Sequence, residues 1–366
     1  MSSHLKRKKS KPASAGFALS GMTATETEQS PQAYPFLNSP ISGKQKVKKM
    51  AHNLSIFNGV AEMAYNGERP WHGLGQSVSD GASIEQWLQE ARMEWEIKQS
   101  PVHFMNGSLH TFPQHQVLYR SDSNAPLSVV SDRYKVVQPR EMLEFFRSLV
   151  ENEGFTIETV GSLKGGRRIW ALAETHIADE VGSGDKIKAY LLLITSCDGS
   201  LATTAKFVST RVVCWNTQGV ALGENGLEVK VRHNTVFDPN VVKGKMGLIG
   251  RKAFGDFMEN MRGLSKAKIS MLDAGRIIGS LLPTPAGEKS VEEGKGFKTI
   301  MGLFQGNALG HSLPGVSGTA WGLLNAVTEY TDHHIRARNP ENRLDSSWFG
   351  VGSNLKAATE ELLLTM

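Results

Sequence analysis

The sequence has little cysteine and no long apolar run. Its 366 residues include two cysteines, Cys197 and Cys214, which are too few for a disulfide-bonded scaffold or a cysteine zinc site. No segment reaches the roughly 20 apolar residues that cross a membrane, and the N-terminus lacks the apolar core of a secretory signal. We therefore expect a folded cytoplasmic protein with reduced thiols and no membrane partner.

Acidic residues are scarce in the first 50 residues. This segment holds nine Lys and Arg against Glu26 and Glu28, a net charge of +7, whereas the whole chain carries +5. The rest of the chain is therefore close to neutral, at −2. The segment is also poor in apolar residues, and such a composition cannot form a core. We expect residues 1–49 to be a disordered basic tail, and patterned sequence begins at Met50.

Motifs that mark enzymes and metal sites are also missing. Cys214 lacks the flanking signature of a catalytic thiol. The glycine pairs at 73–75 and 165–166 match neither a dinucleotide-binding nor a phosphate-binding loop. His333 and His334 are adjacent, so on a helix they would point in different directions. We expect polar contacts at a helix end there, rather than a metal site, and we expect no catalytic residues and no cofactor.

Three glycine turns join segments with the composition of strands. Asn106-Gly107 separates residues 102–105 from 109–112, Gly165-Gly166 separates 155–163 from 168–175, and Asp198-Gly199 separates 186–197 from 201–215. Short turns of this kind are strong hairpin signals. The spacing leaves no room for the connecting helices that parallel strands need. The sequence therefore predicts an α+β fold with a central antiparallel sheet of hairpins.

Helical patterns flank these strands. Ser83, followed by Gln86, has the pattern of a capping box, and Pro139 is suited to the first turn of a second helix. Residues 51–82 are rich in glycine and turn residues, which favours an ordered loop anchored by Trp71. Helical spacing dominates after residue 239. We expect a sheet domain over residues 50–238 and a mainly helical C-terminal region over residues 239–366.

Basic residues are concentrated within this nearly neutral body. Residues 229–268 carry nine Lys and Arg against three acidic residues. A basic stripe can bind a phosphate backbone, and aromatic residues near it can stack on bases. The alternative is an ordinary solvated basic surface above core aromatics. The candidate nucleic-acid-binding residues are Lys164, Arg167, Arg168, Lys206, Arg211, Trp215, Lys230 and Arg232.

The run Thr210–Thr217 leaves a second possibility open. Arg211 and Asn216 bracket an apolar strand-like segment, and a buried polar group without a partner costs about 1–3 kcal/mol. These side chains therefore either close an internal hydrogen-bond network or bind a ligand. The ligand alternative is a small-molecule or nucleotide-processing enzyme, with a pocket near Trp71, His72, Arg211, Asn216 and His333. A host-interaction protein without catalysis is a third possibility.

The family resemblance rests on residues 50–52, 70–75, 130–137, 161–163 with 165–167, 210–217, 318–321 through 325–330, and 332–333. With them, the chain from Met50 onward resembles phage/plasmid-like proteins of unknown function. This resemblance implies an origin in mobile elements. A more distant analogy, to phage single-strand annealing proteins, implies an oligomer with a basic groove. We expect a homo-oligomer that binds single-stranded DNA or RNA independently of sequence, with DNA annealing in phage or plasmid recombination as its role.

Overall fold

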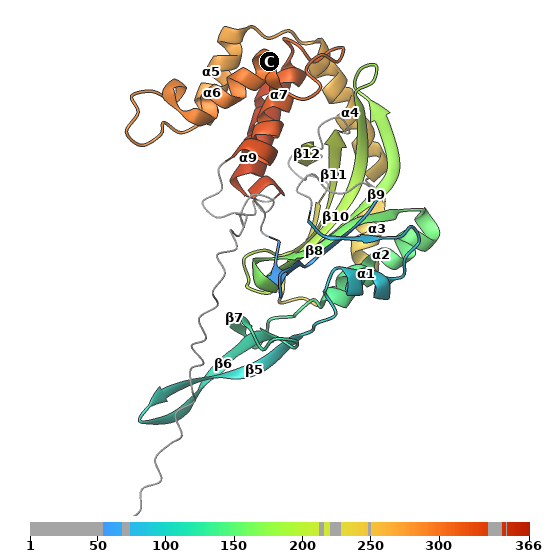
Figure 1. Cartoon of the computed structure of the whole chain (residues 1–366), viewed down its shortest axis with the longest axis vertical. Coiled ribbons are helices and arrows are strands. Elements are labelled where there is room, and N and C mark those ends of the chain that lie inside the picture. Colours follow the sequence, from blue (N-terminus) through green and yellow to red (C-terminus); the bar gives the residue numbers. More distant parts are fainter. Residues whose placement is uncertain are drawn as a thin grey trace, which may run out of the picture. The chain divides into compact units, whose positions relative to one another are not determined.

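The computed structural model describes residues 54–67, 74–211, 216–219, 228–247, 250–335, 346–348 and 350–366, and Figure 1 shows their elements. The strands are β1 Ile56–Phe57, β2 Val60–Ala61, β3 Met63–Asn66, β4 Gln76–Val78, β5 Ile97–Asn106, β6 Ser108–Arg120, β7 Pro126–Ser131, β8 Thr156–Leu163, β9 Arg168–Glu180, β10 Lys186–Ser196, β11 Thr203–Arg211, β12 Asn216–Gly219 and β13 Glu228–Val231. The helices are α1 Ile84–Glu90, α2 Pro139–Glu153, α3 Pro239–Gly247, α4 Gly250–Lys266, α5 Met271–Leu281, α6 Lys295–Gly302, α7 Ala320–Glu329 and α9 Val351–Leu364.

A large, mostly antiparallel sheet forms the centre of the fold. Its strands lie in the order β12-β11-β10-β9-β8-β3-β4, and β13 also pairs with β11. β12 pairs with residues 208–211 of β11 and β13 with residues 203–206, so the two short strands follow one another along one edge. The parallel pairing in this sheet is between β3 and β4. The predicted α+β fold with a central antiparallel sheet is confirmed.

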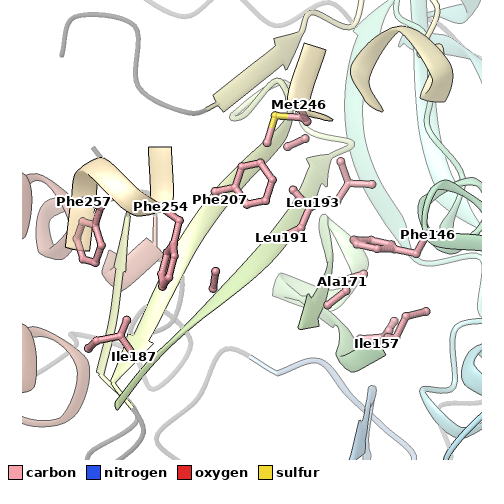
Figure 2. Close-up of a cluster of buried hydrophobic side chains, with 14 of the residues drawn as sticks. Phe146, Ile157, Ala171, Ile187, Leu191, Leu193, Phe207, Met246, Phe254 and Phe257 are labelled. Atoms are coloured by element: carbon pink, nitrogen blue, oxygen red, sulfur yellow. The ribbon is translucent and has the colours of Figure 1, made fainter. Parts of the chain in front are cut away.

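One face of the sheet packs against helices. Alternate residues of the long strands point into this core, because successive side chains of a strand point to opposite faces. Figure 2 shows sheet residues meeting aromatic and methionine side chains from the helices. The same core contains residues on both sides of residue 238, and the division expected there stays a prediction. The labelled residues are Phe146, Ile157, Ala171, Ile187, Leu191, Leu193, Phe207, Met246, Phe254 and Phe257.

The opposite face of the sheet carries a second apolar cluster. Trp170 and Tyr190 are each 1% exposed there, and the Trp348 ring packs edge-on against Trp170. Trp170 pairs with Gly161 on the neighbouring strand, and the absence of a side chain at Gly161 leaves room for the indole ring. The large sheet is therefore covered on both faces, so both sets of alternating side chains are buried.

A second, three-stranded sheet has the order β5-β6-β7. It is tied to the large sheet by Arg120, at the end of β6, which donates to both carboxylate oxygens of Glu62. Burial lowers the pKa of Arg120, but its hydrogen bonds to Asp122 and Glu62 outweigh burial and raise it overall. The guanidinium also lies 4.1 Å from the centre of the Trp95 ring. This buried network fixes the inner end of β6.

Most local sequence signals lead to the expected elements. Ser83 and Gln86 form a complete capping box at α1, Pro139 begins α2, and hairpins form at all three glycine turns. The expectation of a loop over residues 51–82 is wrong for the described part, which contains the four short strands β1–β4. β3 is stabilised by pairing with distant β8, which local composition does not show. Trp71 lies outside the described residues.

Candidate nucleic-acid interface

Two adjoining hollows meet at the segment after β13. The first has a volume of about 630 Å³ and is lined by residues 131–135 with His233 and Asn234. The second has a volume of about 430 Å³, and Lys230, Arg232 and Lys245 are among its lining residues. His233 and Asn234 line the first hollow, and their chain neighbours on either side, residues 230–232 and 235–236, line the second. We call the two together the basic hollow.

The walls of the basic hollow are held together by Tyr134 and His233. The two rings stack with their centres 4.4 Å apart and their planes 14° apart. The Tyr134 hydroxyl donates to the carbonyl of Ser196 at 2.8 Å, and burial raises its pKa, so the hydroxyl keeps its proton at neutral pH. The chain segments at residues 134 and 233, distant in sequence, are thereby fixed side by side.

Both ring nitrogens of His233 face backbone carbonyls. Nδ1 lies 3.0 Å from the oxygen of Lys135, and Nε2 lies 3.0 Å from the oxygen of Leu201. A carbonyl oxygen only accepts, so the ring donates to both when it carries both protons and a positive charge. His233 therefore connects three segments: the 131–135 loop, the turn between β10 and β11, and the stretch after β13.

Four cations at the basic hollow lack a carboxylate partner. Within the part of the chain that the structure describes, Arg133, Lys135, Arg232 and Lys245 form no ion pair, and all four are exposed. Several exposed arginines elsewhere are compensated by a carboxylate. Those that pair with neighbouring carboxylates are Arg140 with Glu85, Arg147 with Glu144, Arg262 with Asp179 and Arg276 with Asp273. The basic hollow therefore gathers four exposed cations that no carboxylate of the described chain compensates.

The acidic residues at the basic hollow are Asp132 and Asp238. Asp238 accepts from the backbone N–H groups of Asn240 and Val241, at the start of α3, where a carboxylate is favoured by the helix dipole. Lys230, a fifth cation, pairs with Glu228. Asp132 is exposed beside Arg133. The lining residues still leave a surplus of positive charge, which suits a polyanion.

The structure brings two of the predicted binding residues into this surface and separates others from it. Lys230 and Arg232 line the basic hollow. Arg168 is 9% exposed and donates to the hydroxyl of Ser200, and burial lowers its pKa. The expectation that the 164–168 turn exposes three cations is wrong for Arg168. Its side chain is covered because it begins β9 opposite Ser196, beneath the following turn.

The rest of this turn remains close to the basic hollow. Arg167 is exposed and Lys164 half-buried. The Arg167 carbonyl accepts from the N–H of Cys197, and the same 196–201 turn accepts from Tyr134 and His233 through its carbonyls. The 196–201 turn therefore connects the 164–168 turn to the basic hollow. Cys197 itself is buried, and burial raises the pKa of its thiol to about 12.

The remaining predicted residues lie elsewhere or cannot be placed. Lys206 is half-buried on β11, where burial lowers its pKa, and it faces Glu228, Lys230, Lys356 and Glu360. Arg211 pairs through its backbone with Asn216. The side chains of Arg211 and Asn216, and the whole of Trp215, lie outside the described residues.

The pocket expected for an enzyme is not assembled by the described residues. Trp71 and His72 lie outside them, and His333 sits in a π-helical turn, Tyr330–His334, at the end of α7. The described residues contain no group of three His, Cys, Asp or Glu side chains placed to hold a metal ion. The predicted polar contacts at this helix end are confirmed. They join Glu329 to His334 at 3.6 Å and Asp332 to Lys356 at 2.9 Å.

Sequence reasoning missed most of the basic hollow. Arg133, Tyr134 and Lys135 lie in a segment that we used for family resemblance alone, although two cations around a tyrosine were a usable signal. His233 gave no local signal, because it acts through a contact with Lys135, about a hundred positions away in the chain. Lys245 belongs to the basic stretch 229–268 and lines the second hollow together with Lys230 and Arg232. Figure 1 shows α3, which carries Lys245, among the helices beside the large sheet.

Comparisons with known proteins identify the family of the chain. No helix in the described ranges is long and apolar enough to cross a membrane. Neither a curated protein nor a solved structure matches the chain. A family model described as a domain of unknown function, DUF932, matches residues 126–348. The matched stretch contains the loop, the turn and the helix that form the basic hollow. It spans more than half of the sequence, so the chain belongs to the DUF932 family.

Proposed function

We propose that this protein binds single-stranded nucleic acid independently of sequence, with the phosphates held in the basic hollow. The observation that carries the proposal is the meeting of Arg133, Lys135, Arg232 and Lys245, without ion-pair partners in the described chain, on an open surface. Phosphate contacts position a nucleic acid without reading its bases. Arg167, exposed on the neighbouring turn, is a further candidate for phosphate contact.

The wider role that we propose is DNA annealing in phage or plasmid recombination, by a homo-oligomer in the cytoplasm. Support comes from the resemblance of the chain to phage/plasmid-like proteins and from the open form of the basic hollow. An open hollow suits a chain-like ligand better than an enclosed small molecule, because ligand pockets usually bury most of a small ligand. RNA in place of DNA is an outcome that the binding experiment decides.

The test is a binding assay on the full chain with labelled single-stranded DNA, duplex DNA and single-stranded RNA. The variant Arg133→Ala with Lys135→Ala removes two cations and leaves intact the backbone contacts of Lys135 with His233. We expect single-stranded DNA to bind more tightly than duplex, and the variant to bind it several-fold more weakly, because counterion release is lost.

A charge-matched control separates the basic hollow from general electrostatics. Lys295→Ala with Lys298→Ala removes two cations from α6, in the C-terminal helices, and we expect it to bind like the wild type. The proposal is contradicted if the wild type binds none of the three ligands at low salt. It is equally contradicted if the α6 control loses as much affinity as the Arg133, Lys135 variant.

A further inference from the structure

The hairpin β5–β6 extends beyond the third strand of its sheet. β7 pairs with residues 115–119 of β6, whereas residues 102–106 of β5 pair with residues 108–112 of β6. Figure 1 shows this part as a long two-stranded ribbon that runs past β7. We call residues 102–112 the outer arm. A two-stranded ribbon without further packing is marginally stable, so contact with a partner would stabilise the outer arm.

One face of the outer arm is aromatic. Phe104 lies opposite His110, and Phe112 lies opposite Val102, on the same side of the ribbon. The Phe104 and His110 rings stack with their centres 5.3 Å apart, and the ring centres of Phe112 and His115 lie 4.8 Å apart. Phe104 is 48% exposed and Phe112 is 45% exposed. The outer arm therefore presents two aromatic pairs that the described chain leaves accessible to a partner.

The other face of the outer arm is largely apolar and carries no phenyl ring. It presents Met105 opposite Leu109 and His103 opposite Thr111, and Met105 and Leu109 are both strongly exposed. Both faces expose large apolar side chains, and they differ in their phenyl rings. This difference provides a matched internal control for any role of stacking.

The whole hairpin lacks negative charge. Between Ile97 and Arg120 there is no Asp or Glu, whereas Lys98, Arg120 and three histidines are present. The root of the hairpin also adjoins the basic hollow, because the N–H of Asp132 donates to the carbonyl of Gln114 and His115 pairs with Ser131. The hairpin thus joins a wall of the basic hollow at residues 131 and 132, where Asp132 is exposed, and adds no carboxylate of its own.

We propose that the aromatic face of the outer arm stacks on unpaired bases of the strand whose phosphates lie in the basic hollow. This inference rests on the proposed function and adds what holds the bases. Stacking on aromatic rings tolerates every base, which agrees with binding independent of sequence. It also requires unpaired bases, so the outer arm supplies the preference for single strands over duplex.

The experiment compares two labelled strands of equal length, oligo-dT and an abasic strand with the same phosphates. The variant Phe104→Leu with Phe112→Leu keeps the apolar character of the outer arm and removes its two phenyl rings. We expect its Kd for oligo-dT to rise roughly tenfold and its Kd for the abasic strand to stay that of the wild type. The control variant Met105→Ala with Leu109→Ala should bind both strands like the wild type.

A second variant and two further measurements make the outcome decisive. Phe104→Trp with Phe112→Trp keeps stacking rings and should bind oligo-dT at least as tightly as the wild type. Circular dichroism checks that each variant is folded. Sedimentation velocity checks the oligomeric state. If the Phe104, Phe112 variant changes its assembly while its affinity per protomer for oligo-dT stays constant, the aromatic face binds a second copy of the chain, and the proposal is overturned.

The failure of this inference can be told apart from the failure of the proposed function. If the wild type binds neither strand, the basic hollow is not a nucleic-acid site and both proposals fall. If the wild type binds both strands, and the Arg133, Lys135 variant is weakened but the Phe104, Phe112 variant is not, the basic hollow stands and the role of the outer arm is wrong.

Discussion

Arg120 shows how one residue ties two sheets of this protein together. Its side chain is 4% exposed, and Glu62, its partner, is 1% exposed. The Glu62 carboxylate also accepts from the hydroxyl of Ser162 on β8. Removing one member of a buried ion pair leaves the other charge without compensation, which costs far more than the pair itself contributes.

We expect Arg120→Ala to destabilise the protein by about 3–5 kcal/mol, as measured by urea unfolding at pH 7. The loss includes the buried Glu62 charge and the contact with Trp95. Arg147→Ala is the control. Arg147 is an exposed arginine whose ion pair with Glu144 lies on the helix surface, and its variant should unfold close to the wild type. Equal unfolding midpoints for the two variants would show that the buried network does not hold the sheets together.

Glu158 is a second residue whose environment decides its chemistry. Tyr190 is 1% exposed, and its hydroxyl donates a hydrogen bond to Glu158 at 3.0 Å. The pKa of Glu158 is raised from 4.5 to about 7, mainly by burial; the hydrogen bond from Tyr190 opposes the rise, the nearby Glu174 charge adds to it, and Lys188 opposes it. In the folded protein Glu158 therefore keeps a proton that the unfolded chain has already lost between these two pH values.

Because the native state binds more protons in that range, stability should fall as the pH rises from about 4.5 to about 7 and level off above it. We expect Glu158→Gln, which is always neutral, to be more stable than the wild type at pH 8, on the order of 1–3 kcal/mol. The advantage should vanish near pH 4. Glu144→Gln is the opposite case, because Arg147 lowers the pKa of Glu144, and it should gain nothing at pH 8.

At the scale of the elements, β8 and β9 depend on a glycine. A Cβ at Gly161 would lie 2.1 Å from the Trp170 ring, closer than any real carbon contact. Gly161→Ala should therefore displace Trp170 and cost roughly 1–3 kcal/mol. Gly244→Ala in α3, where a Cβ meets nothing within 4 Å, should be neutral or stabilising. Thermal unfolding of the two variants checks this, and a harmless Gly161→Ala would mean that the ring can move aside.

The elements that sequence reasoning found are those with local causes. The capping box at Ser83 and the turn at Gly107, with φ of 72°, are determined by neighbouring residues. β3 and β13 were not predicted as strands, because each is four residues long and is stabilised by pairing with a distant strand. The burial of Arg168 was missed for a related reason. Alternation along a strand does not reveal that both faces of the sheet are covered.

At the scale of the whole molecule, the candidate site depends on contacts that no single segment contains. Lys230 and Arg232 could be proposed from charge alone, and both line the basic hollow. The loop at residues 131–135 could not be joined to them from sequence, because the link is the His233 ring between the carbonyls of Lys135 and Leu201. Composition revealed an excess of cations, and the fold determines which of them lack a carboxylate partner.

The most direct test of the basic hollow is the salt dependence of single-strand binding by the full chain. The logarithm of the affinity for oligo-dT should fall linearly with the logarithm of the salt concentration, by about 0.7 for each phosphate contact. Replacing Arg133 and Lys135 with alanine should make this slope shallower by about 1.4, while the α6 control keeps the slope of the wild type. A slope that is the same in all three proteins would contradict the assignment of phosphate binding to the basic hollow.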